Sequence, residues 1–194
     1  PELNSVEMSL NNFAGIYYAS VGLNPAFSSC TIESNTYGIY SPSPDNSFAP
    51  PAPGIYTLID NLNDIAINGG TISSDRTWSY FEGGYAILGS VSIKASGQNP
   101  RLTIDPGTTL RFDVGKNMQI GGDSSEGGEL YAEGTSGNEI TFTSLNGEVG
   151  GWNGLVFDDG SDSYSSSSSL KYCIVEKGVD YNLYSYLTQE PFIL

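Results

Sequence analysis

The chain of 194 residues has no histidine, and only seven lysines and arginines against 22 aspartates and glutamates. Without histidine, Ser-His-Asp and Cys-His catalysis are excluded, and so is metal binding by imidazole. The formal net charge of −15 repels a phosphate backbone, which excludes nucleic acid as a partner. The apolar runs are far shorter than the roughly 20 residues that a membrane-spanning helix needs, so no membrane span is expected.

Cysteine is also scarce. Two residues, Cys30 and Cys173, are too few for a disulfide framework. An acidic chain rich in serine, glycine and asparagine is compatible with an extracellular or cell-surface location. The sequence begins at Pro1 with neither an initiator methionine nor a signal-peptide pattern, which indicates a matured polypeptide or a piece of a longer one.

Helical periodicity is almost absent, and short alternating segments take its place. Apolar and polar residues alternate at 102–104, 110–114 and 140–142, as in strands that bury one face. Turn-forming sequences such as Asp105-Pro106-Gly107 and Asn146-Gly147 separate these segments. The pattern predicts an all-β protein.

A repeat of about 24 residues relates distant segments. Residues 3–8 align with 27–32 and again with 170–175, and a second short strand follows at 15–17, 38–40 and 182–184. A return at this length places like residues over like in a parallel stack, with about 4.8 Å between strands.

The alignment predicts two apolar ladders in the core. The first comprises Val6, Cys30 and Cys173, and the second comprises Met8, Ile32 and Val175. Six coils would separate the two cysteines by about 29 Å, whereas a disulfide needs Cα atoms within about 7 Å. We therefore predict that both cysteines are reduced and buried.

Five segments carry a resemblance to known proteins: 69–78, 102–112, 128–144, 151–157 and 170–176. Their Gly-Gly-Thr-Ile, Leu-Thr-Ile-Asp-Pro-Gly-Thr-Thr-Leu and Gly-Trp-Asn-Gly-Leu sequences resemble the pectate-lyase-like repeats of large bacterial secreted and surface proteins. The resemblance implies a right-handed parallel β-helix, a solenoid of one chain with coils of about 24 residues. It predicts a single domain over residues 1–194 without end caps, with loops leaving the coil near 41–53 and 158–169.

Carboxylates are the only plentiful ionisable groups, and pectate-lyase-like enzymes use them to hold Ca²⁺ or as acid and base. Asp158, Asp159 and Asp162 form the densest acidic loop and are a weak Ca²⁺ candidate, although they lack the spacing of an EF-hand loop. No other cofactor is expected. The polygalacturonase motifs of this family are not present, and Arg101 and Arg111, on either side of a turn with Asp105, are candidates for a lyase base or ordinary surface charges.

Tyrosines recur beside the second strand of the repeat: Tyr17, Tyr18, Tyr37, Tyr40, Tyr56, Tyr181, Tyr184 and Tyr186. Such rings pack on one another, stack on sugar rings or form a protein interface. All three readings remain open at this point.

The preferred hypothesis is a non-catalytic, extracellular structural or adhesive β-helix. It would associate through open coil ends into a filament or surface fibre, or continue within a longer chain. The alternative is a polysaccharide lyase or hydrolase, or a carbohydrate-binding β-helix that uses its lateral face.

Overall fold

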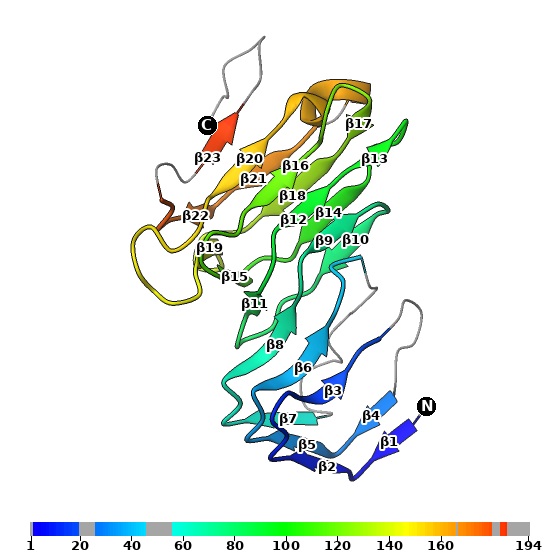
Figure 1. The fold of residues 1–194 in the computed structure, drawn as a ribbon, viewed down its shortest axis with the longest axis vertical. Helices are drawn as coiled ribbons and strands as arrows, with labels where there is room; N and C mark the ends of the chain where they lie inside the picture. The colour runs from blue at the N-terminus through cyan, green and yellow to red at the C-terminus, as the bar shows by residue number, and fades with distance from the viewer. Residues whose placement is uncertain (1, 20–25, 46–55, 166, 180–182, 186–194) are drawn as a thin grey trace.

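The computed structural model describes residues 2–19, 26–45, 56–165, 167–179 and 183–185. They form short β-strands and one 3-10 helix, η1 (Asp159–Ser165), so the all-β prediction is confirmed. Among these residues, no helix is both long and apolar enough to cross a membrane. The strands form an elongated molecule with the N-terminal strands at one end and the C-terminal strands at the other (Figure 1).

The first strands show the predicted register. The two-stranded sheet pairs β1 (Glu2–Asn4) with β4 (Ala26–Ser28), and the three-stranded sheet has the order β2-β5-β7, with bounds Glu7–Ser9, Cys30–Glu33 and Tyr56–Ile59. Leu3 lies opposite Phe27 and Met8 opposite Ile32, both in parallel. The Thr31 amide donates to the Val6 carbonyl at 3.0 Å. The 24-residue repeat is therefore confirmed here.

The longest sheet has seven parallel strands in the order β22-β19-β15-β11-β8-β6-β3. Their bounds are Cys173–Val175, Ile140–Ser144, Thr109–Phe112, Tyr85–Ile87, Asn63–Ile67, Tyr37–Ser41 and Ala14–Tyr17. One apolar residue from each strand forms a continuous ladder in the core: Val175, Phe142, Leu110, Tyr85, Ile65, Ile39 and Ile16. Burial of such a ladder is the main source of stability in a stack of short strands.

Two further parallel sheets complete the core. The four-stranded sheet has the order β10-β14-β18-β21, with bounds Arg76–Trp78, Arg101–Ile104, Glu129–Glu133 and Ser169–Lys171. The five-stranded sheet has the order β23-β20-β16-β12-β9, with bounds Leu183–Ser185, Leu155–Phe157, Met118–Ile120, Val91–Ile93 and Gly70–Ile72. A small antiparallel pair, β13 (Ala95–Ser96) and β17 (Glu126–Gly127), projects beside them.

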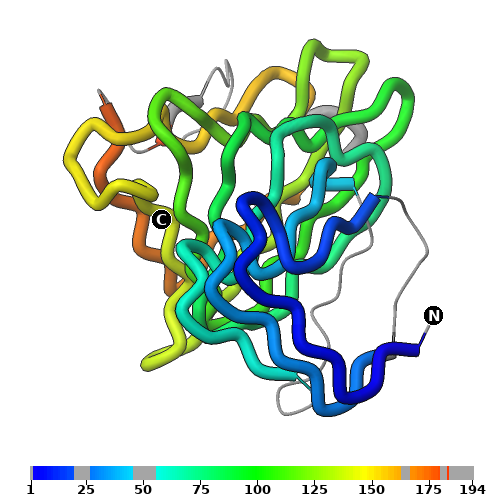
Figure 2. Tube along the Cα trace, turned by 60° about the horizontal axis from the view of Figure 1, so that its bottom comes forward, coloured from blue at the N-terminus to red at the C-terminus, as the bar shows by residue number. Residues whose placement is uncertain are grey.

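The chain visits these sheets in a fixed order. From β10 onward it passes four times through the four-stranded, the seven-stranded and the five-stranded sheet in turn, and we call each passage a circuit. In Figure 2 the successive circuits lie one behind another along the molecule. Paired residues are 23 apart at Ile16–Ile39, but 33 apart at Phe142–Val175. The expected constant length of about 24 residues therefore holds only for the first circuits.

The predicted ladders are correct at their N-terminal members and wrong at their C-terminal ones. Cys30 and Ile32 lie on β5 in the three-stranded sheet, whereas Cys173 and Val175 lie on β22 in the seven-stranded sheet, opposite Ile140 and Phe142. The second-strand alignment fails in the same way. Ile16 pairs with Ile39 as predicted, but Leu183 pairs with Leu155 in the five-stranded sheet.

A shared bend explains this error. Ser5, Ser29 and Tyr172 occupy the same position in the aligned segments, and all three have positive φ, of 54°, 53° and 47°. Each separates two short strands, so the alignment matched a strand–bend–strand corner rather than one face of the stack. Left-handed backbone is uncommon for residues other than glycine, and its recurrence marks a shared corner geometry.

A ladder of asparagines occupies another corner. Asn11, Asn35 and Asn61 follow β2, β5 and β7. The Asn35 Oδ1 accepts hydrogen bonds from the amide and the Nδ2 of Asn11, at 3.0 and 2.9 Å, and the Asn61 Oδ1 accepts from Asn35 in the same way. Asn35 is only 3% exposed. The ladder joins three circuits and satisfies polar backbone that the corner would otherwise bury unpaired.

The two expected loops have different outcomes. The loop near 158–169 is confirmed, because η1 separates β20 from β21 there. Most of the loop near 41–53 lies outside the described residues. Its described part, at Asp45, accepts hydrogen bonds from Ser73 and forms an ion pair with Arg76 at 3.1 Å.

Ion pairs join neighbouring strands of the four-stranded sheet. The Lys171 Nζ lies 2.6 Å from the Glu133 Oε1, and Arg101 pairs with Glu129. The hydrogen bond from Lys171, followed by that from Ser169, lowers the pKa of Glu133 to about 2. A lowered pKa stabilises the fold above the ordinary value of 4.5, and this stabilisation is lost as the pH falls toward 2.

Replacing Lys171 with methionine is expected to raise the pKa of Glu133 toward 4.5, because the largest cause of the shift is removed. Carboxyl ¹³C titration by NMR measures this change. The control is Lys177→Met, which removes a cation paired instead with Glu176. An unchanged Glu133 titration in the Lys171 variant would contradict the register between β18 and β21.

Candidate functional site

The most distinctive surface feature is a group of four aromatic rings, Phe13, Tyr17, Tyr37 and Tyr40, which we call the aromatic patch. The Phe13 centroid lies 4.7 Å from that of Tyr40, 5.4 Å from that of Tyr37 and 6.2 Å from that of Tyr17. The Tyr40 ring also lies 5.4 Å from Tyr17 and 5.5 Å from Tyr37. Every ring therefore contacts at least two others.

The strands β3 and β6 position the patch. Ile16 and Ile39 turn into the core, so the next residues, Tyr17 and Tyr40, turn outward and lie opposite each other in the parallel register. The Tyr37 amide donates to the Phe13 carbonyl at 2.7 Å, which brings the other two rings together. The patch thus lies on the outer face of the seven-stranded sheet, across its two N-terminal strands.

The patch has a buried base and an exposed rim. Tyr40 is 9% exposed and belongs to a small outer cluster with Ala66 and Ala86, both fully buried. Phe13 is 46% exposed and Tyr17 is 55% exposed. Two large rings therefore offer surface to solvent while neighbouring rings fix their positions.

Three phenol groups lie close enough to influence one another. The pKa of Tyr40 is raised, first by burial and then by the neighbouring phenols of Tyr17 and Tyr37. All three hydroxyls are therefore neutral donors and acceptors at neutral pH. The patch combines apolar ring faces with a cluster of uncharged hydroxyls.

The surroundings of the patch are acidic. The first 75 residues contain seven carboxylates and no lysine or arginine. Along the outer ladder of the seven-stranded sheet, Tyr40 is followed by Ala66, Ala86 and then Arg111. The Arg111 Nη2 donates to the Gly83 carbonyl, so this guanidinium serves the next circuits.

The structure places the remaining predicted tyrosines elsewhere. Tyr18 is buried in the core, and Tyr56 lies 5.8 Å from Phe27. Tyr181, Tyr186 and the side chain of Tyr184 lie outside the described residues. Phe13 was missed by the sequence analysis because only tyrosines were compared. The common spacing of Phe13 and Tyr17, and of Thr36 and Tyr40, was a signal that could have identified it.

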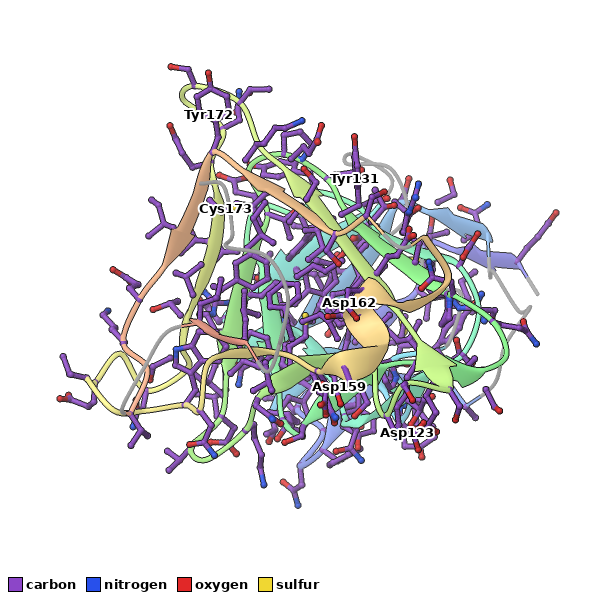
Figure 3. The ribbon with its side chains drawn as sticks, turned by 90° about the horizontal axis from the view of Figure 1, so that it is seen from above. Asp123, Tyr131, Asp159, Asp162, Tyr172 and Cys173 are labelled. Atoms are coloured by element: carbon purple, nitrogen blue, oxygen red, sulfur yellow. The ribbon has the colours of Figure 1, made fainter. Side chains whose placement is uncertain are left out.

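The three aspartates of the Ca²⁺ candidate do not converge. The Asp158 carboxylate accepts from the Gln119 Nε2 at 2.8 Å and from the Asp159 amide at 3.0 Å. Asp159 and Asp162 lie on η1, near the C-terminal end of the molecule (Figure 3). Across the described part of the chain, no three acidic, cysteine or histidine side chains are grouped to hold a metal ion.

The two arginines considered as a lyase base do not bracket Asp105 as a pair. Arg101 pairs with Glu129, whose carboxylate is 5% exposed and also accepts from the Asn99 Nδ2 and the Ser167 amide. This carboxylate joins three successive strand entries and is occupied by structural partners. Chemically, the arrangement fixes the four-stranded sheet.

Both cysteines are free thiols. The Cys30 Sγ donates to the Leu3 carbonyl at 3.2 Å, and the Cys173 Sγ to the Ala132 carbonyl at 3.2 Å. Burial raises the pKa of Cys173 to about 11, so this thiol is protonated at neutral pH and is a poor nucleophile. Tyr172, next to it, lies at an outer corner, well separated from Tyr131 (Figure 3).

Comparison of the chain with family models, with curated proteins and with solved structures finds no match.

Proposed function

We propose that the chain is a right-handed parallel β-helix and serves as a non-catalytic, extracellular structural segment. Its circuits are the coils of the helix. The observation that carries the proposal is the apolar ladder of seven residues across seven parallel strands. Such a ladder makes each coil a continuation of the previous one, as in a solenoid that works as a rigid spacer or fibre.

Features between the coils support a structural role. The asparagine ladder and the ion pairs of Arg101 and Lys171 all join residues of successive coils. They restrict sliding of one coil over the next, because each contact depends on register. The acidic composition, with few lysines, favours a location outside the cell, as expected from the sequence.

The N-terminal coil supports association through coil edges. Among the described residues, β1, β2 and β3 each end their sheets, so their outer backbone groups have no partner strand. Met8 on β2 packs against the core from this side and is only partly buried. An open strand edge pairs readily with another strand, either from a longer chain or from a second copy.

Sizing by light scattering over a range of protein concentrations tests this association. We expect the mass to rise with concentration, and electron microscopy to show short rods. Met8→Lys places a charge on the inward edge and is expected to keep the chain monomeric. Glu7→Lys, on the same strand but exposed, is the matched control. A compact monomer at every concentration would overturn association through this edge.

The enzymatic alternative has its own test. Incubation with polygalacturonate and other acidic polysaccharides, with and without Ca²⁺, is expected to give neither unsaturated products nor new reducing ends. Cleavage that is lost in Glu129→Gln would overturn the non-catalytic assignment. That carboxylate is the most buried acidic group described, and it is paired with an arginine.

A further inference from the structure

The aromatic patch has the properties of a binding surface for a planar, weakly polar ligand. Two of its rings are about half exposed, while most large apolar side chains of the described residues are in the core. A contiguous exposed apolar surface on a soluble fold commonly marks a binding site. Packing among the four rings holds Phe13 and Tyr17 in place, so a ligand would meet a surface that is already ordered.

Ring geometry favours stacking rather than insertion. Tyr17 and Tyr40 are tilted by 31°, whereas Phe13 meets Tyr37 edge-on at 85°. The electron-rich face of an aromatic ring attracts the polarised C–H bonds on one face of a pyranose ring. The adjacent tyrosine hydroxyls would exchange hydrogen bonds with the hydroxyls of the sugar. A linear sugar chain can contact rings on both strands, which are about 4.8 Å apart.

Charge decides between classes of glycan. The seven carboxylates of residues 1–75, with no lysine or arginine among them, repel uronic acids and sulfated sugars. The same field repels nucleic acids, whose bases would otherwise stack on such rings. A neutral glycan has no charge to repel, and its hydroxyls can donate to carboxylates.

We propose that Phe13, Tyr17, Tyr37 and Tyr40 form a binding site for a neutral oligosaccharide on the lateral face of the first two coils. The site is separate from the strand edges that the proposed association uses. Glycan binding can therefore fail while self-association holds, and the reverse.

The test is calorimetric and NMR titration of the whole chain with cellohexaose, mannohexaose and xylohexaose, and with hexagalacturonate as the acidic counterpart. We expect at least one neutral hexasaccharide to bind, with hexagalacturonate at least tenfold weaker. Tyr17→Ala is expected to weaken binding at least tenfold, and Tyr17→Phe to retain most of it.

The matched control is Tyr80→Ala, which removes a ring that is 49% exposed and lies outside the patch. It is expected to leave binding unchanged. Circular dichroism and thermal melting establish that each variant folds. Three results would overturn the proposal: no neutral hexasaccharide binds, hexagalacturonate binds equally well, or Tyr17→Ala changes the oligomeric state but not sugar binding. The third result would assign the patch to a protein contact.

Discussion

Replacement of Trp152 by alanine is expected to lower the free energy of unfolding by about 3–5 kcal/mol, because the side chain is large and fully buried. The indole stacks on Phe112, with a centroid distance of 4.5 Å and an interplanar angle of 13°. Its Nε1 donates to the Glu176 carbonyl at 2.7 Å. The variant therefore loses core packing and also leaves a backbone acceptor of the next circuit unpaired.

Urea unfolding followed by circular dichroism measures this loss. Val149→Ala is the control, because Val149 lies three residues away but is 84% exposed. Its effect is expected to stay within about 0.5 kcal/mol. If the Trp152 variant lost less than about 1 kcal/mol, the indole would not be a core residue, and the packing of the last circuits would need revision.

Replacement of Asn35 by alanine is expected to cost about 2–4 kcal/mol, because buried groups that it satisfies would be left without partners. Its side chain bridges three circuits: it accepts from Asn11, and donates to the Met8 carbonyl and the Asn61 Oδ1, each at 3.0 Å. Urea unfolding again gives the magnitude. Loss of the ladder should also speed hydrogen exchange at the Asn11 amide.

Asn12→Ala is the matched control, since Asn12 is an exposed neighbour of the same residue type. We expect it to change stability by at most about 0.5 kcal/mol. Equal effects of the two alanine variants would show that the ladder contributes no more than an ordinary surface asparagine.

Short-range sequence patterns predicted the strands and the first repeat. The match between residues 3–8 and 27–32 found a real register because the two segments are adjacent circuits of nearly equal length. The same pattern at 170–175 was misplaced. Its corner has the same backbone bend, with Tyr172 in place of Ser5, but stands between different sheets. A local bend does not identify the face of the stack that it serves.

The asparagine ladder was present in the sequence but was not recognised. Asn11, Asn35 and Asn61 each precede the second strand at nearly constant spacing, yet turns commonly contain asparagine, and composition alone does not separate a ladder from solvent-facing turns. The aromatic patch was only half predicted. Recurrence of tyrosines indicated a surface feature, but which rings meet depends on the outward turn of Tyr17 and Tyr40.

The acidic loop shows the opposite limit. Sequence density placed three aspartates within five residues, but the fold turns Asp158 toward Gln119 on the neighbouring strand. A cluster along the chain becomes a metal site only when the backbone aims its oxygens at one point.

The central claim, that circuits distant in sequence stack in parallel, is tested most directly by a distance across the seven-stranded sheet. Tyr17 on β3 and Ile174 on β22 are 55% and 45% exposed, and lie on its two outermost strands. Spin labels at Y17C and I174C, in a chain carrying C30A and C173S, can be measured by double electron–electron resonance. Six steps of about 4.8 Å predict a narrow distribution near 29 Å. A distance below about 20 Å, or a broad distribution without a peak, would contradict the parallel stack.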